Sequence, residues 1–84
     1  MAKITLYSAD WCPFCVRAKR LLEGKGVAFD EVNVDKQPGK REEMVAKTGY
    51  KTIPMIFIND KFIGGFSELS ALEAKGELDS MIKQ

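Results

Sequence analysis

The stretch 4–24, ITLYSADWCPFCVRAKRLLEG, joins an apolar run to a helical pattern that opens at a pair of cysteines. The run 4–7 predicts a short buried strand. Pro13 suits the first position of a helix, because its missing N–H would be unpaired there in any case. Gly24 and Gly26 mark the expected end of that helix. A strand followed closely by a helix is therefore predicted.

The cysteines in this stretch, Cys12 and Cys15, are the only two in the chain. The unpaired N–H groups and partial positive charge of a helix N-terminus favour a thiolate at Cys12. Cys15 lies one helical turn later, near enough to form a small disulfide and on the edge of the expected buried face. In a chain without histidine, this spacing favours thiol–disulfide exchange over metal binding. Two packed structural cysteines are the alternative interpretation.

The composition is that of an ordinary soluble protein. With 84 residues we expect one domain spanning 1–84, and with 45% apolar residues, 30% charged residues and a net charge of +1 we expect no nucleic-acid or membrane partner. The start, MAKITLY, passes directly into a strand pattern and lacks the apolar stretch of a signal peptide. We therefore expect a cytoplasmic protein, and we expect it to be a monomer.

The middle of the chain predicts a second strand and a second helix. Residues 27–34 alternate in polarity, and two strands joined by a helix of this length form a parallel, right-handed unit. Pro38 is expected to begin the second helix, and Gly49 is placed to cap its C-terminus.

The last third of the chain predicts a hairpin and more helix. The apolar runs 55–58 and 62–63 are separated by Asn-Asp-Lys, which indicates a β-hairpin loop. Ser67 offers an N-cap for a helix ending at Gly76, and 78–82 predict a last short amphipathic turn.

Three motifs follow one another in this framework: Cys12-Pro13-Phe14-Cys15 on the first helix, Thr52-Ile53-Pro54 before the third strand, and Gly64-Gly65 after the fourth. In these motifs and their order the chain resembles the dithiol glutaredoxins over essentially its whole length. The resemblance implies an α/β domain with the thioredoxin fold, in which a four-stranded mixed sheet is flanked by helices in the order βαβ-α-ββα plus a short C-terminal helix.

The resemblance also implies a glutathione-dependent thiol–disulfide oxidoreductase that acts on protein disulfides and glutathione mixed disulfides. We predict that Cys12 is the nucleophile, because a more acidic thiol is also the better leaving group when its mixed disulfide is attacked. Cys15 would resolve protein mixed disulfides, whereas deglutathionylation would need Cys12 alone. Glutathione is then a co-substrate, no metal is expected, and the partners are disulfide-bonded or glutathionylated proteins, with ribonucleotide reductase among the candidates.

A glutathione site beside the cysteines is implied as well. In glutaredoxins the equivalent of Pro54 is cis, and the backbone of the residue before it, here Ile53, pairs with the cysteinyl part of glutathione. The glycine pair would let the backbone approach the tripeptide, and the N–H groups at Ser67-Glu68 would receive the γ-glutamyl carboxylate. The full predicted site comprises Phe14, Lys51, Thr52, Ile53, Pro54, Gly65, Ser67 and Glu68, supported by Trp11, Pro13 and Gly64.

The chain departs from the family pattern on either side of the site. Many glutaredoxins carry a lysine where this chain has Ala9, and we expect Lys51 to replace it. Many also have Asp-Asp after the glycine pair, where only Glu68 is acidic here. Trp11 and the Gly-Phe at this corner are reminiscent of the glutaredoxin-like hydrogen donors of ribonucleotide reductase, which are reduced by thioredoxin reductase. That donor activity is our alternative function.

Two further readings involve metal or surface recognition. An iron–sulfur cluster carrier would use Cys12 and an external glutathione from each of two subunits as four ligands, but Pro13 tends to hinder cluster assembly. Two cysteines without histidine cannot supply a closed zinc site. Trp11 and Phe66 flank the predicted site, and an exposed apolar rim there would suit docking of protein disulfides, although single exposed aromatics are common.

Overall fold

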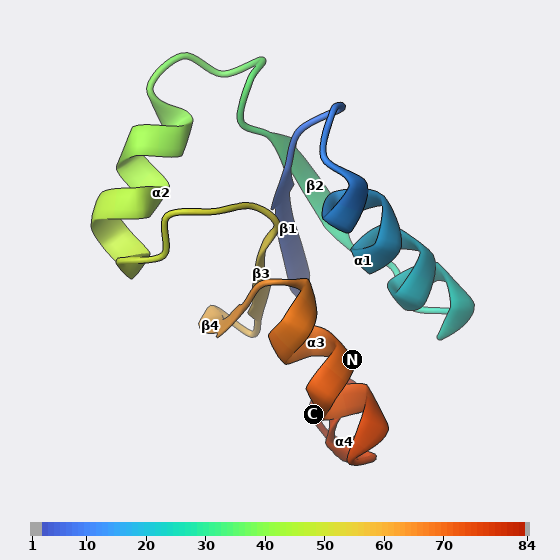
Figure 1. Ribbon diagram of the computed structural model, residues 1–84. Coiled ribbons are helices and arrows are strands. Elements are labelled where there is room, and N and C mark those ends of the chain that lie inside the picture. The colour runs from blue at the N-terminus through green and yellow to red at the C-terminus, as the bar shows by residue number, and fades with distance from the viewer. Residues whose placement is uncertain (1–2, 84) are drawn as a thin grey trace.

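The computed structural model describes residues 3–83 (Figure 1). Its elements are, in chain order, β1 (Ile4–Ser8), α1 (Pro13–Gly24), β2 (Asp30–Asn33), α2 (Lys40–Thr48), β3 (Met55–Ile58), β4 (Lys61–Gly64), α3 (Phe66–Ala74) and α4 (Glu77–Ile82). No helix in this part of the chain has the length and apolar character needed to cross a bilayer.

The four strands form one mixed sheet in the order β2-β1-β3-β4. β1 pairs parallel with β2 and antiparallel with β3, and β3 pairs antiparallel with β4. The predicted mixed sheet and order of elements are confirmed. Figure 1 shows α1 and α3 together on one side of the sheet and α2 on the other, so that the start of α1, the start of α3 and the loop before β3 lie near one another.

The main core lies between the sheet and the helices α1, α3 and α4. Aliphatic side chains from five elements are almost fully buried there, at no more than 2% exposure each: Ile4, Leu6, Ala18, Leu22, Ile56, Ile58, Leu69 and Leu78. Burial of each large aliphatic side chain contributes about 1.5–3 kcal/mol. A smaller cluster holds the cysteines among Ala9, Val34 and Ile53. This second cluster seats the candidate site against the sheet.

The boundaries of two predicted elements are different from the structure. The strand predicted over 27–34 is shorter, Asp30–Asn33, because β2 is an edge strand paired with β1 alone. The helix predicted to begin at Pro38 begins at Lys40, because Gly39 has a φ of 79°, in the left-handed region that a helix cannot include. The hairpin turn has positive φ at Asn59 and Asp60, as a tight two-residue loop requires.

The predicted N-cap at Ser67 is also wrong. Helix α3 begins at Phe66, and Gly65 is its N-cap residue. The Glu68 carboxylate folds back and accepts a hydrogen bond from the Gly65 N–H at 2.7 Å, which fixes the start of the helix earlier than the serine.

One cationic side chain joins the ends of α1, α3 and α4 that lie away from the cysteines. The Lys25 Nζ lies 2.8 Å from a Glu73 oxygen and 2.7 Å from an Asp79 oxygen. Lys25 directly follows α1, Glu73 is in the last turn of α3, and Asp79 is on α4. Three helices therefore share this contact.

Candidate active site

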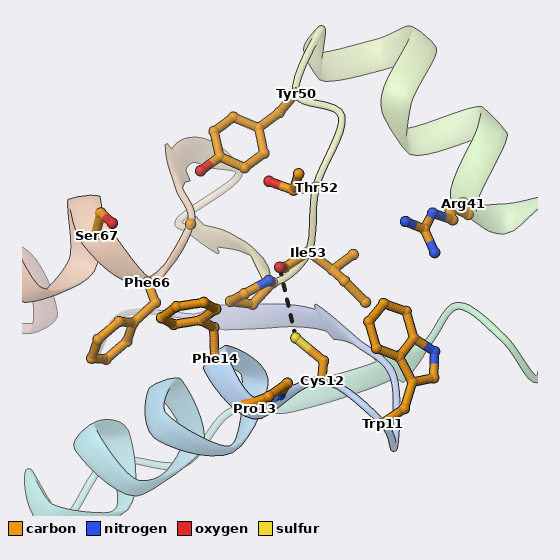
Figure 2. A pocket seen from close by; sticks show the side chains of 12 residues that line it. Trp11, Cys12, Pro13, Phe14, Arg41, Tyr50, Thr52, Ile53, Phe66 and Ser67 are labelled. Atoms are coloured by element: carbon orange, nitrogen blue, oxygen red, sulfur yellow. Dashed lines mark hydrogen bonds between the residues drawn. The ribbon is translucent and has the colours of Figure 1, made fainter.

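Cys12 is the N-cap residue of α1. Its Sγ accepts a hydrogen bond from the Cys15 N–H at 3.2 Å, and its thiol donates toward the Ile53 carbonyl oxygen at 3.7 Å (Figure 2). The Cys15 N–H is one of the donors left unpaired at the start of α1, and the Cys12 sulfur satisfies it. The structure thus places Cys12 where the sequence predicts it, at the opening of the helix.

Cys15 lies in the first turn of α1 and is fully buried. Burial raises the pKa of the Cys15 thiol to about 12, and the hydrogen bond with Cys12 adds to this effect. At neutral pH Cys15 is therefore a neutral thiol. No disulfide joins the two cysteines, and their side chains differ in environment: Cys12 lines a pocket, and Cys15 lies behind it.

A pocket of about 360 Å³ opens over Cys12. This volume is within the range of small-molecule sites. The pocket brings together most of the residues that the sequence predicts, namely Trp11, Cys12, Pro13, Phe14, Thr52, Ile53, Pro54, Gly65 and Ser67. Figure 2 shows Cys12 between Phe14 and Phe66 on one side and Trp11 on the other. The peptide bond between Ile53 and Pro54 is cis, as the family resemblance implies.

Four predicted site residues are not part of the pocket lining: Cys15, Lys51, Gly64 and Glu68. Lys51 is exposed to solvent. The Glu68 carboxylate accepts hydrogen bonds from the Gly65 N–H and, at 3.1 Å, from the Tyr50 hydroxyl. The first of these bonds in particular lowers the pKa of Glu68. In this arrangement the charge of Glu68 serves the start of α3.

The two glycines at this corner make room for side chains. A Cβ at Gly64, where φ is +126°, would lie 2.7 Å from the Glu68 side chain, and one at Gly65 would lie 2.5 Å from the Tyr50 hydroxyl. Both distances are shorter than any ordinary contact between heavy atoms. The glycine pair therefore allows Glu68 and Tyr50 to close over the turn.

Sequence reasoning missed two lining residues, Arg41 and Tyr50. Arg41 is on α2, and its guanidinium carbon lies 5.8 Å from the centre of the Trp11 ring. Tyr50 follows α2 and packs edge-on against Phe62, with ring centres 5.4 Å apart. For Tyr50 the signal was an aromatic residue just ahead of the Thr-Ile-Pro motif. Arg41 lies in a run of charges whose facing direction no local pattern reveals.

The helical spacing places Phe14 on the same side of α1 as the buried residues Ala18 and Leu22, but Phe14 is exposed. Its side chain is 51% exposed, and its ring centre lies 6.1 Å from that of Phe66. Phe14 is the second residue of α1, in a turn that faces the pocket. Trp11 is 60% exposed, and its indole N–H donates to the Asp35 carboxylate. Phe66, which the sequence placed in an exposed rim with Trp11, is half-buried, and the exposed aromatic side chains beside the pocket are Trp11 and Phe14.

Within residues 3–83 no group of three or more histidine, cysteine, aspartate or glutamate side chains is placed to hold a metal ion. The only thiols of the chain are those of the two cysteines, both packed in the smaller apolar cluster.

Residues 4–63 match the family model described as Glutaredoxin. The chain is 47% identical over 83 residues to Glutaredoxin 3 of Escherichia coli, covering 99% of this chain and 100% of that one. It is 43% identical over 82 residues to a glutaredoxin of Pseudomonas aeruginosa, covering 98% of each.

The fold matches solved glutaredoxin structures. A buckwheat glutaredoxin–glutathione complex gives a TM-score of 0.93 at 25% identity, covering 98% of this chain and 77% of that one. A Brucella melitensis glutaredoxin gives 0.88 at 42% identity, covering 99% and 90%. These matches confirm the predicted thioredoxin fold.

Proposed function

The chain belongs to the glutaredoxin family, and we propose that it reduces protein disulfides and glutathione mixed disulfides with glutathione as the reductant. Membership of this family makes it a thiol–disulfide oxidoreductase. The reductant, the substrates and the roles of the two cysteines are the content of the proposal.

The observation that carries the proposal is the asymmetry of the cysteine pair. Cys12 Sγ caps α1 and lines the pocket, whereas Cys15 is a buried thiol of raised pKa one turn deeper. The thiolate is the attacking species in disulfide exchange, so the cysteine that faces the pocket and accepts an N–H is the nucleophile.

The reaction then runs in four exchanges. The Cys12 thiolate attacks the substrate disulfide, forms a mixed disulfide and releases one substrate thiolate, which takes up a proton. Cys15 loses its proton and attacks the Cys12 sulfur, which releases the second substrate thiol and leaves a Cys12–Cys15 disulfide. Two glutathione thiols then reduce that disulfide in turn and leave as glutathione disulfide. Two electrons pass from two glutathiones to one substrate disulfide. For a glutathione mixed disulfide, Cys12 takes up the glutathionyl group and a second glutathione removes it.

The shape and charge of the pocket support glutathione as the ligand. Its volume suits a tripeptide, and the backbone of Ile53 lies beside the Cys12 sulfur, where a peptide backbone could pair with it. Arg41 is a cation on one side, and the N-terminus of α3 at Ser67 lies on the other, so each carboxylate of glutathione has a favourable partner. We therefore assign to Arg41, in place of Lys51, the role of the cation that pairs with a carboxylate of glutathione.

Reduction by thioredoxin reductase is the second candidate, favoured by the exposure of Trp11 beside Cys12. Two coupled assays separate the candidates. One supplies glutathione, glutathione reductase and a small glutathione mixed disulfide; the other supplies thioredoxin reductase, NADPH and a disulfide acceptor. Turnover in the first assay supports the proposal, and turnover in the second assay alone would contradict it.

The variant Cys15→Ser tests the division of labour between the cysteines. It should retain activity on the small glutathione mixed disulfide and lose activity on protein disulfides that need resolution. Loss of both activities would show that Cys15 is required for the attack by Cys12, the step that both substrates share.

A further inference from the structure

The large apolar side chains that are most exposed in residues 3–83 all lie around the start of α1. They are Trp11 at 60%, Phe14 at 51% and Val16 at 39% exposure. Trp11 and Phe14 both line the pocket over Cys12, and exposed apolar surface gathered at one place marks interaction sites. The pocket uses Trp11 and Phe14 but not Val16.

A cation lies over this surface. The guanidinium carbon of Arg17 lies 5.4 Å from the centre of the Phe14 ring, at the i,i+3 spacing that makes neighbours on a helix. The Phe14 ring also packs against the Phe66 ring, and the two ring centres are 6.1 Å apart. A guanidinium that stacks on a ring keeps its N–H groups available to bind a carboxylate in bidentate fashion.

Carboxylates of the protein itself do not neutralise this cation. In the described part of the chain Arg17 makes no ion pair, and the first turn of α1 has no acidic residue. Glu68 is held by the turn before α3, and the Asp35 carboxylate accepts from Trp11. The α1 side of Cys12 is therefore apolar and positively charged.

We propose that Arg17, with Phe14, forms a docking surface for protein disulfides whose cysteine is flanked by an acidic and an apolar residue. This inference rests on the proposed function and specifies its substrate class. Phe14 lines the pocket and Arg17 does not, so a ligand confined to the pocket contacts the ring without using the guanidinium. A longer substrate that is bonded to Cys12 and extends along α1 contacts both. Arg17 thus distinguishes protein disulfides from glutathione mixed disulfides.

The test compares two disulfide-bonded peptides of equal length with the same apolar residue beside the cysteine, one with aspartates and one with lysines at the other flanking positions. A small glutathione mixed disulfide is the third substrate. The variants are Arg17→Gln, Arg17→Glu and the matched control Arg20→Gln, which removes the same charge from an exposed position one turn further along α1. The measured quantity is kcat/KM at low and at physiological salt.

We expect the unmodified protein to prefer the acidic peptide, and salt to weaken that preference because it screens exposed charges. Arg17→Gln should lower kcat/KM for the acidic peptide by about three- to tenfold, mainly through KM, as expected for loss of an exposed charge contact. Arg17→Glu should reverse the preference. Arg20→Gln should change the preference by less than about twofold.

Equal kcat/KM for the two peptides, or equal effects of Arg17→Gln and Arg20→Gln, would overturn the docking surface while leaving the proposed function intact. Absence of turnover with the small glutathione mixed disulfide as well would instead overturn the proposed function, and with it the inference that rests on it.

Discussion

Two helices of this protein begin at the same pocket, and their first turns are completed in different ways. At α1 the cap is the Cys12 sulfur, which accepts the Cys15 N–H. At α3 the cap is internal, because the Glu68 carboxylate accepts the Gly65 N–H. The unpaired N–H groups of a helix start favour negative charge in both cases. At α1 that preference acts on the sulfur that we propose as the nucleophile, and at α3 it is partly satisfied by a side chain that fixes the turn.

The comparison shows that one physical property of helices can serve chemistry or structure, according to which side chain supplies the acceptor. In the proposed reaction the Cys12 sulfur exchanges its contact with the helix for a bond to the substrate. The Glu68 carboxylate is held by Gly65 and Tyr50 and fixes the turn before α3. Changes at the first start should therefore alter activity, and changes at the second should alter stability.

The largest effect should come from Cys12→Ser. A serine oxygen can still cap α1, so the free energy of unfolding should change by no more than about 1–2 kcal/mol. Activity on a small glutathione mixed disulfide should fall by more than about a thousandfold, because the nucleophile is gone. Steady-state turnover together with urea unfolding checks both parts. A large loss of stability would mean that the sulfur is mainly structural.

The next effect concerns the reactivity of the two thiols toward iodoacetamide. Because burial raises the pKa of the Cys15 thiol to about 12, Cys15 in Cys12→Ser should react more than about a hundredfold more slowly at neutral pH than an unfolded cysteine. Its rate should rise with pH toward 12 for as long as the fold persists. Mass spectrometry of the labelled protein measures this, and the same variant in urea is the control. Rapid labelling of Cys15 at neutral pH would contradict the prediction.

Gly65→Ala should break the second helix start. The added Cβ would lie 2.5 Å from the Tyr50 hydroxyl and 3.3 Å from the Pro54 carbonyl oxygen. Such overpacking costs about 1–3 kcal/mol. Gly24→Ala is the matched control, because a Cβ there meets nothing within 4 Å and its backbone is helical. Urea unfolding of both variants measures the difference, and equal stabilities would show that Tyr50 moves aside without cost.

The smallest effect should come from Glu68→Gln, and it should appear in the pH dependence of stability. The Gly65 N–H lowers the pKa of Glu68 in the folded protein. A carboxylate with a lowered pKa stabilises the fold above its unfolded pKa, and this contribution is lost as pH falls through the folded pKa. The unmodified protein should therefore lose more stability between pH 7 and pH 3 than Glu68→Gln, by less than about 1 kcal/mol for an exposed group. An equal loss of stability between the two pH values in both proteins would show that the Glu68 carboxylate does not stabilise the start of α3.

The order of elements, the cysteine pair at a helix start and the loop before β3 could be predicted from the sequence, because each depends on local patterns and on motifs. The direction of Arg41 could not, because it depends on where α2 lies relative to Trp11. The sequence shows Glu68 as the acidic residue that follows the glycine pair, but no local pattern shows that its side chain folds back onto Gly65. Periodicity placed Phe14 with the core, but it cannot tell that the first turn of α1 faces a pocket.

Helix α1 is held at its C-terminal end by the contact of Lys25 with Glu73 and Asp79. Its twelve residues extend about 18 Å at 1.5 Å per residue, with Cys12 at one end and the ionic contact at the other. Because salt screens ion pairs that are partly exposed, we expect high ionic strength to weaken this attachment of α1 to α3 and α4.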